Sequence, residues 1–159
     1  MKVRVGFGYD VHKLESNTPF HLGGIFIEHS KGAVGHSDAD VLIHAICDAM
    51  LGAANLRDIG YHFSDTNPNL KGIDSKILLA ETLKLLESKG FRVVNIDSVV
   101  CLQRPKLMDI IPNMQLTLAS VLKMDMEDIS IKATTTEKLG FVGNEEGVTA
   151  YAVVLIQKD

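Results

Sequence analysis

The chain has no tryptophan, only two cysteines and four prolines, and few aromatic residues, which make up 6% of its 159 residues. Two cysteines without a paired spacing exclude a disulfide scaffold and a zinc ribbon. Positive charge is not in excess either, because 16 Lys and Arg stand against 20 Asp and Glu. The charge balance therefore does not favour non-specific nucleic-acid binding, and we expect no nucleic-acid partner.

Long apolar runs are also missing. No run approaches the roughly 18 residues that suggest a membrane span, and residues 1–6 resemble a strand more than a secretory segment. We expect no membrane contact and a cytoplasmic location. The composition itself is ordinary, with 46% hydrophobic and 23% charged residues, enough for one hydrophobic core. No repeat or linker interrupts residues 1–159, which are predicted to form a single domain.

Hydrophobic periodicity predicts both strands and helices. Val3, Val5 and Phe7 alternate with smaller or polar residues, which is the period of a half-buried strand. Further strands are expected within 20–27 (as a hairpin around Gly-Gly), 91–103, 129–132 and 148–157. Helices are expected over 39–53 with Asp38 as N-cap, from 74 or 75 to about 89, and up to about 123 with Pro112 interrupting the first turns.

This order of elements favours an α/β class fold, specifically an α+β sandwich with a mixed β-sheet and helices packed on one face. The opposite face of the sheet then needs a cover, and a second subunit is one candidate.

The first candidate for chemistry is a metal site. In an extended segment Asp10 and His12 point to the same side, and His44 on the first predicted helix is a possible third ligand. Two imidazoles and one carboxylate with an open fourth position are typical of catalytic zinc. Asp40 and Asp48, four residues on either side of His44, are candidates to accept its other ring N–H. The alternative is a solvated strand end with His44 capped by Asp48.

Cys47 is a rival ligand, because it follows His44 by three positions on the same predicted helix. Its apolar neighbours favour a buried structural thiol instead. A second candidate is the segment 36–40, where a histidine, a serine hydroxyl and helix N-terminal amides would form an anion site. The alternative is a simple helix cap by Ser37 or Asp38.

Two further segments combine polar groups suited to phosphate. In 132–140 three successive threonines precede Glu137, whose carboxylate suits Mg²⁺ or Mn²⁺; the alternative is a β-prone threonine run followed by a cap. In 103–106 two cations in a turn suggest a nucleotide phosphate or a base edge. The alternative there is a solvated turn.

Together these motifs resemble one family. GYDVH at 8–12, GHSDAD at 35–40, HAICDAMLGAA at 44–54, DIG at 58–60 and KATTTEKLGF at 132–141 are similar to those of the 2-C-methyl-D-erythritol 2,4-cyclodiphosphate synthase family, and the resemblance extends from about 3 to 157. It implies a homotrimer with sheets facing the three-fold axis and active sites between subunits.

The resemblance also implies a reaction, that of a phosphorus–oxygen lyase in non-mevalonate isoprenoid biosynthesis. The substrate is a small cytidine diphosphate derivative, 4-diphosphocytidyl-2-C-methyl-D-erythritol 2-phosphate. Its 2-phosphate attacks its own β-phosphorus, which forms 2-C-methyl-D-erythritol 2,4-cyclodiphosphate and releases CMP.

Site residues follow from the resemblance position by position. Asp10, His12 and His44 resemble zinc ligands, and Glu137 resembles the ligand of a second divalent cation, Mg²⁺ or Mn²⁺. His36 and Thr135 are the implied catalytic residues, with His36 and Ser37 contacting phosphate. The remaining substrate-binding set, which also takes in Asp10, His12 and Glu137, is Val11, Asp58, Ile59, Gly60, Phe63, Ser64, Asp65, Thr66, Asn67, Leu102, Gln103, Arg104, Pro105, Lys106, Leu107, Met108, Ala133, Thr134, Thr136, Phe141 and Asn144.

Three positions depart from the family pattern: Asn144, and also Ser64 and Asn67, which stand where members often carry a proline and an acidic residue. Asn144 stands where members often carry an arginine associated with a diphosphate in the axial cavity, and an amide lacks the charge and fork geometry of that group. Two other functions stay open: a zinc hydrolase acting on a nucleotide diphosphate, and a non-catalytic trimer that binds isoprenoid or nucleotide ligands.

Overall fold

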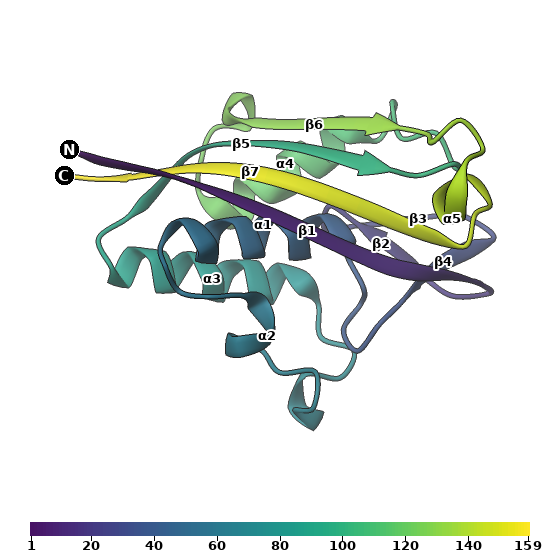
Figure 1. Ribbon diagram of the computed structural model, residues 1–159, viewed down its shortest axis with the longest axis horizontal. Helices are drawn as coiled ribbons and strands as arrows, with labels where there is room; N and C mark the ends of the chain where they lie inside the picture. Colours follow the sequence, from purple (N-terminus) through teal and green to yellow (C-terminus); the bar gives the residue numbers. More distant parts are fainter.

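A computed structural model describes all residues, 1–159. Figure 1 shows a twisted sheet with helices on one side and with both chain termini at the same end. The five-stranded sheet has the order β4-β1-β7-β5-β6, antiparallel except for the β5–β6 pair, and β2 and β3 form a separate hairpin. The strands are β1 (Lys2–Ser16), β2 (Phe20–Leu22), β3 (Ile25–Ile27), β4 (Lys31–Val34), β5 (Arg92–Cys101), β6 (Ile129–Thr134) and β7 (Gly147–Lys158). The helices are α1 (Val41–Ala53), α2 (Ile59–His62), η1 (Pro68–Leu70), α3 (Ser75–Ser88), α4 (Ile111–Leu122), η2 (Met126–Asp128) and α5 (Gly140–Gly143).

The predicted α/β class with a mixed sheet is therefore confirmed, and the three longer helices, α1, α3 and α4, lie on one face of the sheet (Figure 1). The capping of α1 differs from the prediction. Asp40, not Asp38, is the N-cap, and its side chain accepts from the Ile43 amide. The helix accordingly begins at Val41 rather than at 39. None of the helices has both the length and the apolar character needed to cross a bilayer.

Helix α1 packs directly on the backbone of β1. A Cβ atom at Gly6 would lie 1.8 Å from the Ala49 carbonyl oxygen, and one at Gly8 would lie 1.9 Å from the Ala45 carbonyl oxygen. Alanines on the helix and glycines on the strand therefore allow a close approach that larger side chains would block. Because side chains alternate along a strand, Asp10 and His12 continue the same face of β1 and point toward α1 as well.

The opposite face of β1 is apolar and exposed. Val5 and Phe7 are 66% and 63% exposed, and the aromatic ring of Tyr9 lies 4.9 Å from that of Tyr151 on β7. The expectation that the alternating apolar residues of β1 form its buried side is therefore wrong within this chain. The buried side is the glycine side, because the helix occupies the space that side chains would need.

Candidate active site

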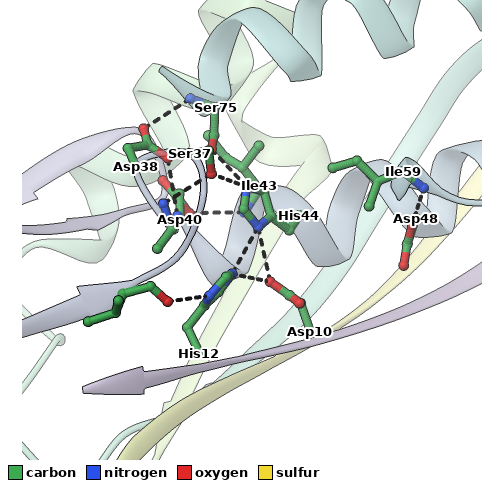
Figure 2. Close-up of polar contacts among 12 residues, drawn as sticks. Asp10, His12, Ser37, Asp38, Asp40, Ile43, His44, Asp48, Ile59 and Ser75 are labelled. Atoms are coloured by element: carbon green, nitrogen blue, oxygen red, sulfur yellow. Dashed lines mark hydrogen bonds and ion pairs between the residues drawn. The ribbon is translucent and has the colours of Figure 1, made fainter. Parts of the chain in front are cut away.

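Three side chains from β1 and α1 meet at one point, as Figure 2 shows. The Oδ2 atom of Asp10 lies 2.9 Å from Nε2 of His12 and 3.1 Å from Nδ1 of His44. The two ring nitrogens are 3.1 Å apart. Tetrahedral zinc ligands at about 2.0–2.1 Å from the ion lie about 3.3 Å from one another. The spacing predicted for a metal site from these three residues is thus present.

The hydrogen bonds of the two rings indicate that this cluster needs a cation. Nδ1 of His12 lies 2.9 Å from the Val34 carbonyl oxygen, which only accepts, so Nδ1 carries the proton and donates it. In the neutral ring Nε2 then presents a lone pair to the Asp10 carboxylate. Two electron-rich atoms at this distance require a proton or a metal ion between them. The residues present therefore fit a divalent cation, and the cluster is a metal site consistent with zinc.

The pKa values of the cluster agree with this reading. Burial acts to raise the pKa of Asp10, but the neighbouring rings of His12 and His44 outweigh it and lower the pKa to about 2. Burial acts to lower the pKa of His12, yet the hydrogen bond and the negative charge of Asp10 raise it above its ordinary value. The carboxylate thus stays ionised over the working range of most enzymes, and the site attracts positive charge.

The cluster opens into a cavity of about 460 Å³. The cavity walls come from the end of β1, the 35–37 loop, α1, the 59–73 region and α3. Nine of the predicted site residues line it: Asp10, His12, His36, Ser37, His44, Ile59, Gly60, Phe63 and Asp65.

The partners predicted for the outer nitrogen of His44 are wrong. Asp40 is fully buried and instead accepts from the amides of Gly23, Gly24 and Ile43, while Asp48 accepts from the Ile59 amide at 2.7 Å. Nε2 of His44 lies 2.9 Å from the hydroxyl oxygen of Ser75 and 3.2 Å from that of Ser37. Ser75 was not a predicted site residue, because only the folding of α3 onto α1 brings it to His44.

Cys47, the rival ligand, lies outside the cluster. It is fully buried in the core, and burial raises the pKa of its thiol to about 12. A neutral thiol of this kind is a poor metal ligand, so the interpretation as a structural thiol is confirmed.

Three backbone amides of the segment 36–40 are already hydrogen-bonded within the chain. The amides of Asp38, Ala39 and Asp40 donate to Ile73, Ser37 and Asp38, respectively. These three amides are therefore not free to bind an anion, and the anion site at His36, Ser37 and the start of α1 stays a prediction. His36 and Ser37 still line the cavity, and Nε2 of His36 lies 3.0 Å from the Asn67 carbonyl oxygen, which ties this segment to the following loop.

The 58–67 loop is attached to α1 through Asp48 and the Ile59 amide. Burial raises the pKa of Asp48 despite that hydrogen bond. The predicted residues of the loop that do not line the metal cavity are Asp58, Ser64, Thr66 and Asn67.

A second, separate hollow of about 290 Å³ lies between the 102–111 segment and the end of β6. Nine predicted substrate-binding residues line it: Leu102, Gln103, Pro105, Lys106, Leu107, Met108, Ala133, Thr134 and Thr135. It shares no residue with the metal cavity. Within one chain the predicted residues are therefore divided between two separate hollows.

The remaining predicted residues lie around these hollows. Glu137 is exposed, with a φ of 53°, and its amide donates to the Thr135 hydroxyl at 3.2 Å. The guanidinium of Arg104 is paired with both carboxylate oxygens of Glu145, at 2.8 and 3.1 Å. Val11 and Phe141 line a third hollow, beside β1, and Thr136 and Asn144 line none of the three.

Comparison with known proteins agrees with this geometry. The model of the YgbB family matches residues 3–157. The chain belongs to the YgbB family. Two YgbB relatives named 2-C-methyl-D-erythritol 2,4-cyclodiphosphate synthase cover nearly the whole chain and nearly their own full length. The protein of Bacteroides thetaiotaomicron is 65% identical over 100% of both chains, and that of Phocaeicola vulgatus is 63% identical over 99% of both.

Solved YgbB structures share the fold as well. The bifunctional IspDF of Campylobacter jejuni aligns with a TM-score of 0.95 and 41% identity over 99% of this chain, which spans 43% of that longer protein. A cyclodiphosphate synthase with bound CDP aligns with a TM-score of 0.90 and 36% identity, over 97% of this chain and 100% of that one. The chain therefore has the fold of its solved relatives over nearly its whole length.

Proposed function

We propose that this protein converts 4-diphosphocytidyl-2-C-methyl-D-erythritol 2-phosphate to 2-C-methyl-D-erythritol 2,4-cyclodiphosphate and CMP, as a phosphorus–oxygen lyase of non-mevalonate isoprenoid biosynthesis. The observation that carries this proposal is the convergence of Asp10, His12 and His44 within about 3 Å of one another beside a cavity of substrate size. Relatives bearing that activity in their names are 60–65% identical to this chain.

The chemistry needs positioning and charge neutralisation more than it needs a base. The oxygen of the 2-phosphate forms a bond to the β-phosphorus, and the bond from that phosphorus to the CMP oxygen breaks, so atoms and charge balance without water. Holding the two phosphates of one molecule in line contributes up to about 7–11 kcal/mol toward the barrier. The loop from Asp58 to Asn67, with the cavity wall at His36 and Ser37, would hold the methylerythritol phosphate end in that alignment.

Asp10, His12 and His44 would hold zinc. When bound, zinc supplies a Lewis acid that draws negative charge from a phosphate oxygen. His36 and Ser37 would donate hydrogen bonds to the phosphates, and Thr135 would contact the reacting group. These donors offset the negative net charge of the chain at the place where a polyanion binds.

Glu137 would hold a second divalent cation, Mg²⁺ or Mn²⁺, which would neutralise negative charge on the diphosphate of the substrate. Its carboxylate is exposed and has only a 3.4 Å contact with the Thr135 hydroxyl, so its oxygens are free for such a role. The hollow between the 102–111 segment and Ala133–Thr135 would receive the cytidine, with Lys106 near its phosphates.

The working form would be a homotrimer with each active site between two subunits. Two observations support this. The metal cavity and the cytidine hollow are separate within one chain, and the sheet face of β1 and β7 exposes a continuous apolar surface that a water-soluble protein rarely leaves uncovered. The apolar residues of this face are Val3, Val5, Phe7, Tyr9, Val11, Tyr151 and Val153. A trimer with this face toward its axis would bring the metal cavity of one subunit next to the cytidine hollow of its neighbour. Each subunit, residues 1–159, would be a single domain of a cytoplasmic enzyme.

The test is a CMP-release assay with zinc and Mg²⁺, combined with identification of the second product by ³¹P NMR. Two mutually coupled phosphorus signals from a cyclic diphosphate, with CMP in equal amount, are expected. A linear phosphate with incorporated solvent oxygen from H₂¹⁸O would show hydrolysis instead. The absence of any turnover with both metals supplied would favour a non-catalytic binding protein.

A further inference from the structure

Ser75, the first residue of α3, connects the metal cluster to a carboxylate that does not touch it. The residue is fully buried. Its hydroxyl oxygen lies 2.9 Å from Nε2 of His44, and the same hydroxyl contacts Oδ1 of Asp38 (Figure 2). The Ser75 backbone N–H donates to Oδ2 of Asp38 at 2.9 Å. Both oxygens of Asp38 are therefore directed at Ser75.

The direction of these hydrogen bonds follows from the chemistry of the groups. An ionised carboxylate has no proton to give, so the Ser75 hydroxyl donates its single proton to Asp38. The hydroxyl oxygen is then left to accept from His44. Nε2 of His44 must carry the ring proton, and its Nδ1 presents a lone pair toward Asp10 and His12. That is the tautomer in which Nδ1 can bind a metal ion.

Ser37 offers a weaker alternative. Its hydroxyl oxygen is 3.2 Å from Nε2 of His44 and already accepts from the Ala39 amide at 3.1 Å. It has no carboxylate behind it that would set the direction of its own proton. The carboxylate–serine–histidine chain is therefore the contact that determines the ring state.

We propose that Asp38 and Ser75 are positioning residues that hold His44 in its metal-binding tautomer, a role which rests on the metal site of the proposed function. Outer partners of this kind typically change metal affinity by about 10–100-fold. In this fold the partner comes from α3, so the docking of α3 on α1 would set the affinity of a site built from β1 and α1.

The first experiment measures zinc Kd by chelator competition for the metal-free full chain and for Ser75→Ala, Asp38→Asn and Ser37→Ala. We expect about 10–100-fold weaker zinc binding for Ser75→Ala and Asp38→Asn, and a smaller change for Ser37→Ala. The amide of Asp38→Asn has two orientations. In one, its NH₂ group faces the Ser75 N–H, so that two donors meet. In the other, the NH₂ group donates to the Ser75 hydroxyl oxygen, the hydroxyl donates to Nε2 of His44, and the ring proton then lies on Nδ1. Circular dichroism of each metal-free variant checks that it is folded.

The second experiment locates the ring proton of His44 directly. Long-range ¹H–¹⁵N NMR of the metal-free protein at pH 8 is expected to show the His44 proton on Nε2, and to show it shifted toward Nδ1 in Asp38→Asn. A proton on Nδ1 in the parent protein would overturn the proposal, as would zinc Kd values of folded Ser75→Ala and Asp38→Asn within twofold of the parent value. A parent protein that binds no zinc would instead refute the metal site itself, so the two failures are distinguishable.

Discussion

The metal cavity and the hollow beside the 102–111 segment differ in how firmly the chain holds the functional groups near them. In the cavity, the side chains of Asp10, His12 and His44 are only 26%, 17% and 11% exposed, and each of the two rings has a second contact that orients it. On the loop that follows Thr135 of the hollow, Glu137 is exposed and its carboxylate has one long contact. The polar side chains of the metal cavity are therefore held in place by contacts within the chain, whereas the carboxylate of Glu137 is not.

This difference agrees with the role proposed for each region. Ligands of a tightly bound ion must be pre-positioned, because the cost of ordering them would otherwise reduce the affinity. A group that meets a metal brought in with the substrate has no such requirement. The cavity thus depends on β1, α1 and α3 of one chain, whereas in the proposed trimer a neighbouring subunit would complete the hollow.

The strongest test of the cavity is His44→Ala. Removal of one of three ligands is expected to abolish stoichiometric zinc binding and to lower CMP release by about 10³-fold, equivalent to about 4 kcal/mol of lost charge stabilisation. Metal analysis and the release assay measure both effects. His21→Ala, which removes an imidazole outside the cavity, is the matched control. Full zinc content in His44→Ala would contradict the ligand assignment.

The dependence of the hollow on a neighbour is tested by Phe7→Glu. Phe7 is 63% exposed on the apolar sheet face, so a charge there is expected to convert a trimer into a monomer and to reduce CMP release by about 100-fold or more. Light scattering gives the mass, and zinc binding should survive because its ligands belong to one chain. Phe26→Glu, at a residue 62% exposed on the separate hairpin, should stay trimeric. A parent mass near 17 kDa would exclude the trimer.

Glu137→Gln tests the exposed carboxylate that is proposed to bind the second cation. Loss of the carboxylate charge is expected to raise the Mg²⁺ or Mn²⁺ concentration for half-maximal rate by about 10–100-fold, while zinc content stays unchanged. Titrations of the divalent cation measure the shift. Glu127→Gln, an exposed carboxylate on η2, serves as control. Superimposable titration curves for Glu137→Gln and the parent would remove Glu137 from this role.

Asp48→Ala separates substrate binding from metal binding in the cavity. Without the acceptor for the Ile59 amide, the 58–60 turn should lose its attachment to α1, and KM is expected to rise about tenfold, as for one hydrogen bond of about 1.4 kcal/mol. Zinc Kd should not change. Asp48→Asn keeps an oxygen acceptor and is expected to restore most of the parent KM. An unaltered KM in Asp48→Ala would show that the attachment is unimportant.

The pH dependence is the smallest expected effect. The folded-state pKa of His12 is raised above its ordinary 6.5, so its contribution to the stability of the metal-free protein is fully present below pH 6.5 and is lost as pH rises through the folded value. The pKa of Asp10 is lowered from 3.8 to about 2, so its contribution is present above pH 3.8 and lost as pH falls toward 2. In urea unfolding of the metal-free chain between pH 5 and 8.5, the free energy of unfolding should therefore decline as pH rises.

Zinc affinity should change in the opposite direction. Zinc displaces the His12 proton, so the affinity is expected to rise by up to about tenfold per pH unit above 6.5 until that proton is lost. Chelator competition over the same pH range measures it. Affinity that stays constant from pH 6 to 8 would contradict the role of His12 as a ligand that must lose a proton.

Much of the fold and of the site could be predicted from local patterns. The cap and length of α3 and the facing of Asp10 and His12 to one side follow from helical and strand periodicity, because these depend on neighbours within a few residues. The pairing of those two residues with His44 required the added inference that α1 lies over β1. The metal ligands could therefore be named from the sequence, whereas their supporting contacts could not.

The sequence by itself determined the family, the ligand types and most of the secondary structure, although it did not predict β4 at Lys31–Val34. Only the tertiary structure decided that the apolar side of β1 faces outward, because Gly6 and Gly8 let α1 approach the strand so closely that the buried side holds no large residue. Only the tertiary structure brought Ser75 to His44, 31 residues away along the chain. Such contacts depend on how elements pack in space, and no local spacing encodes them.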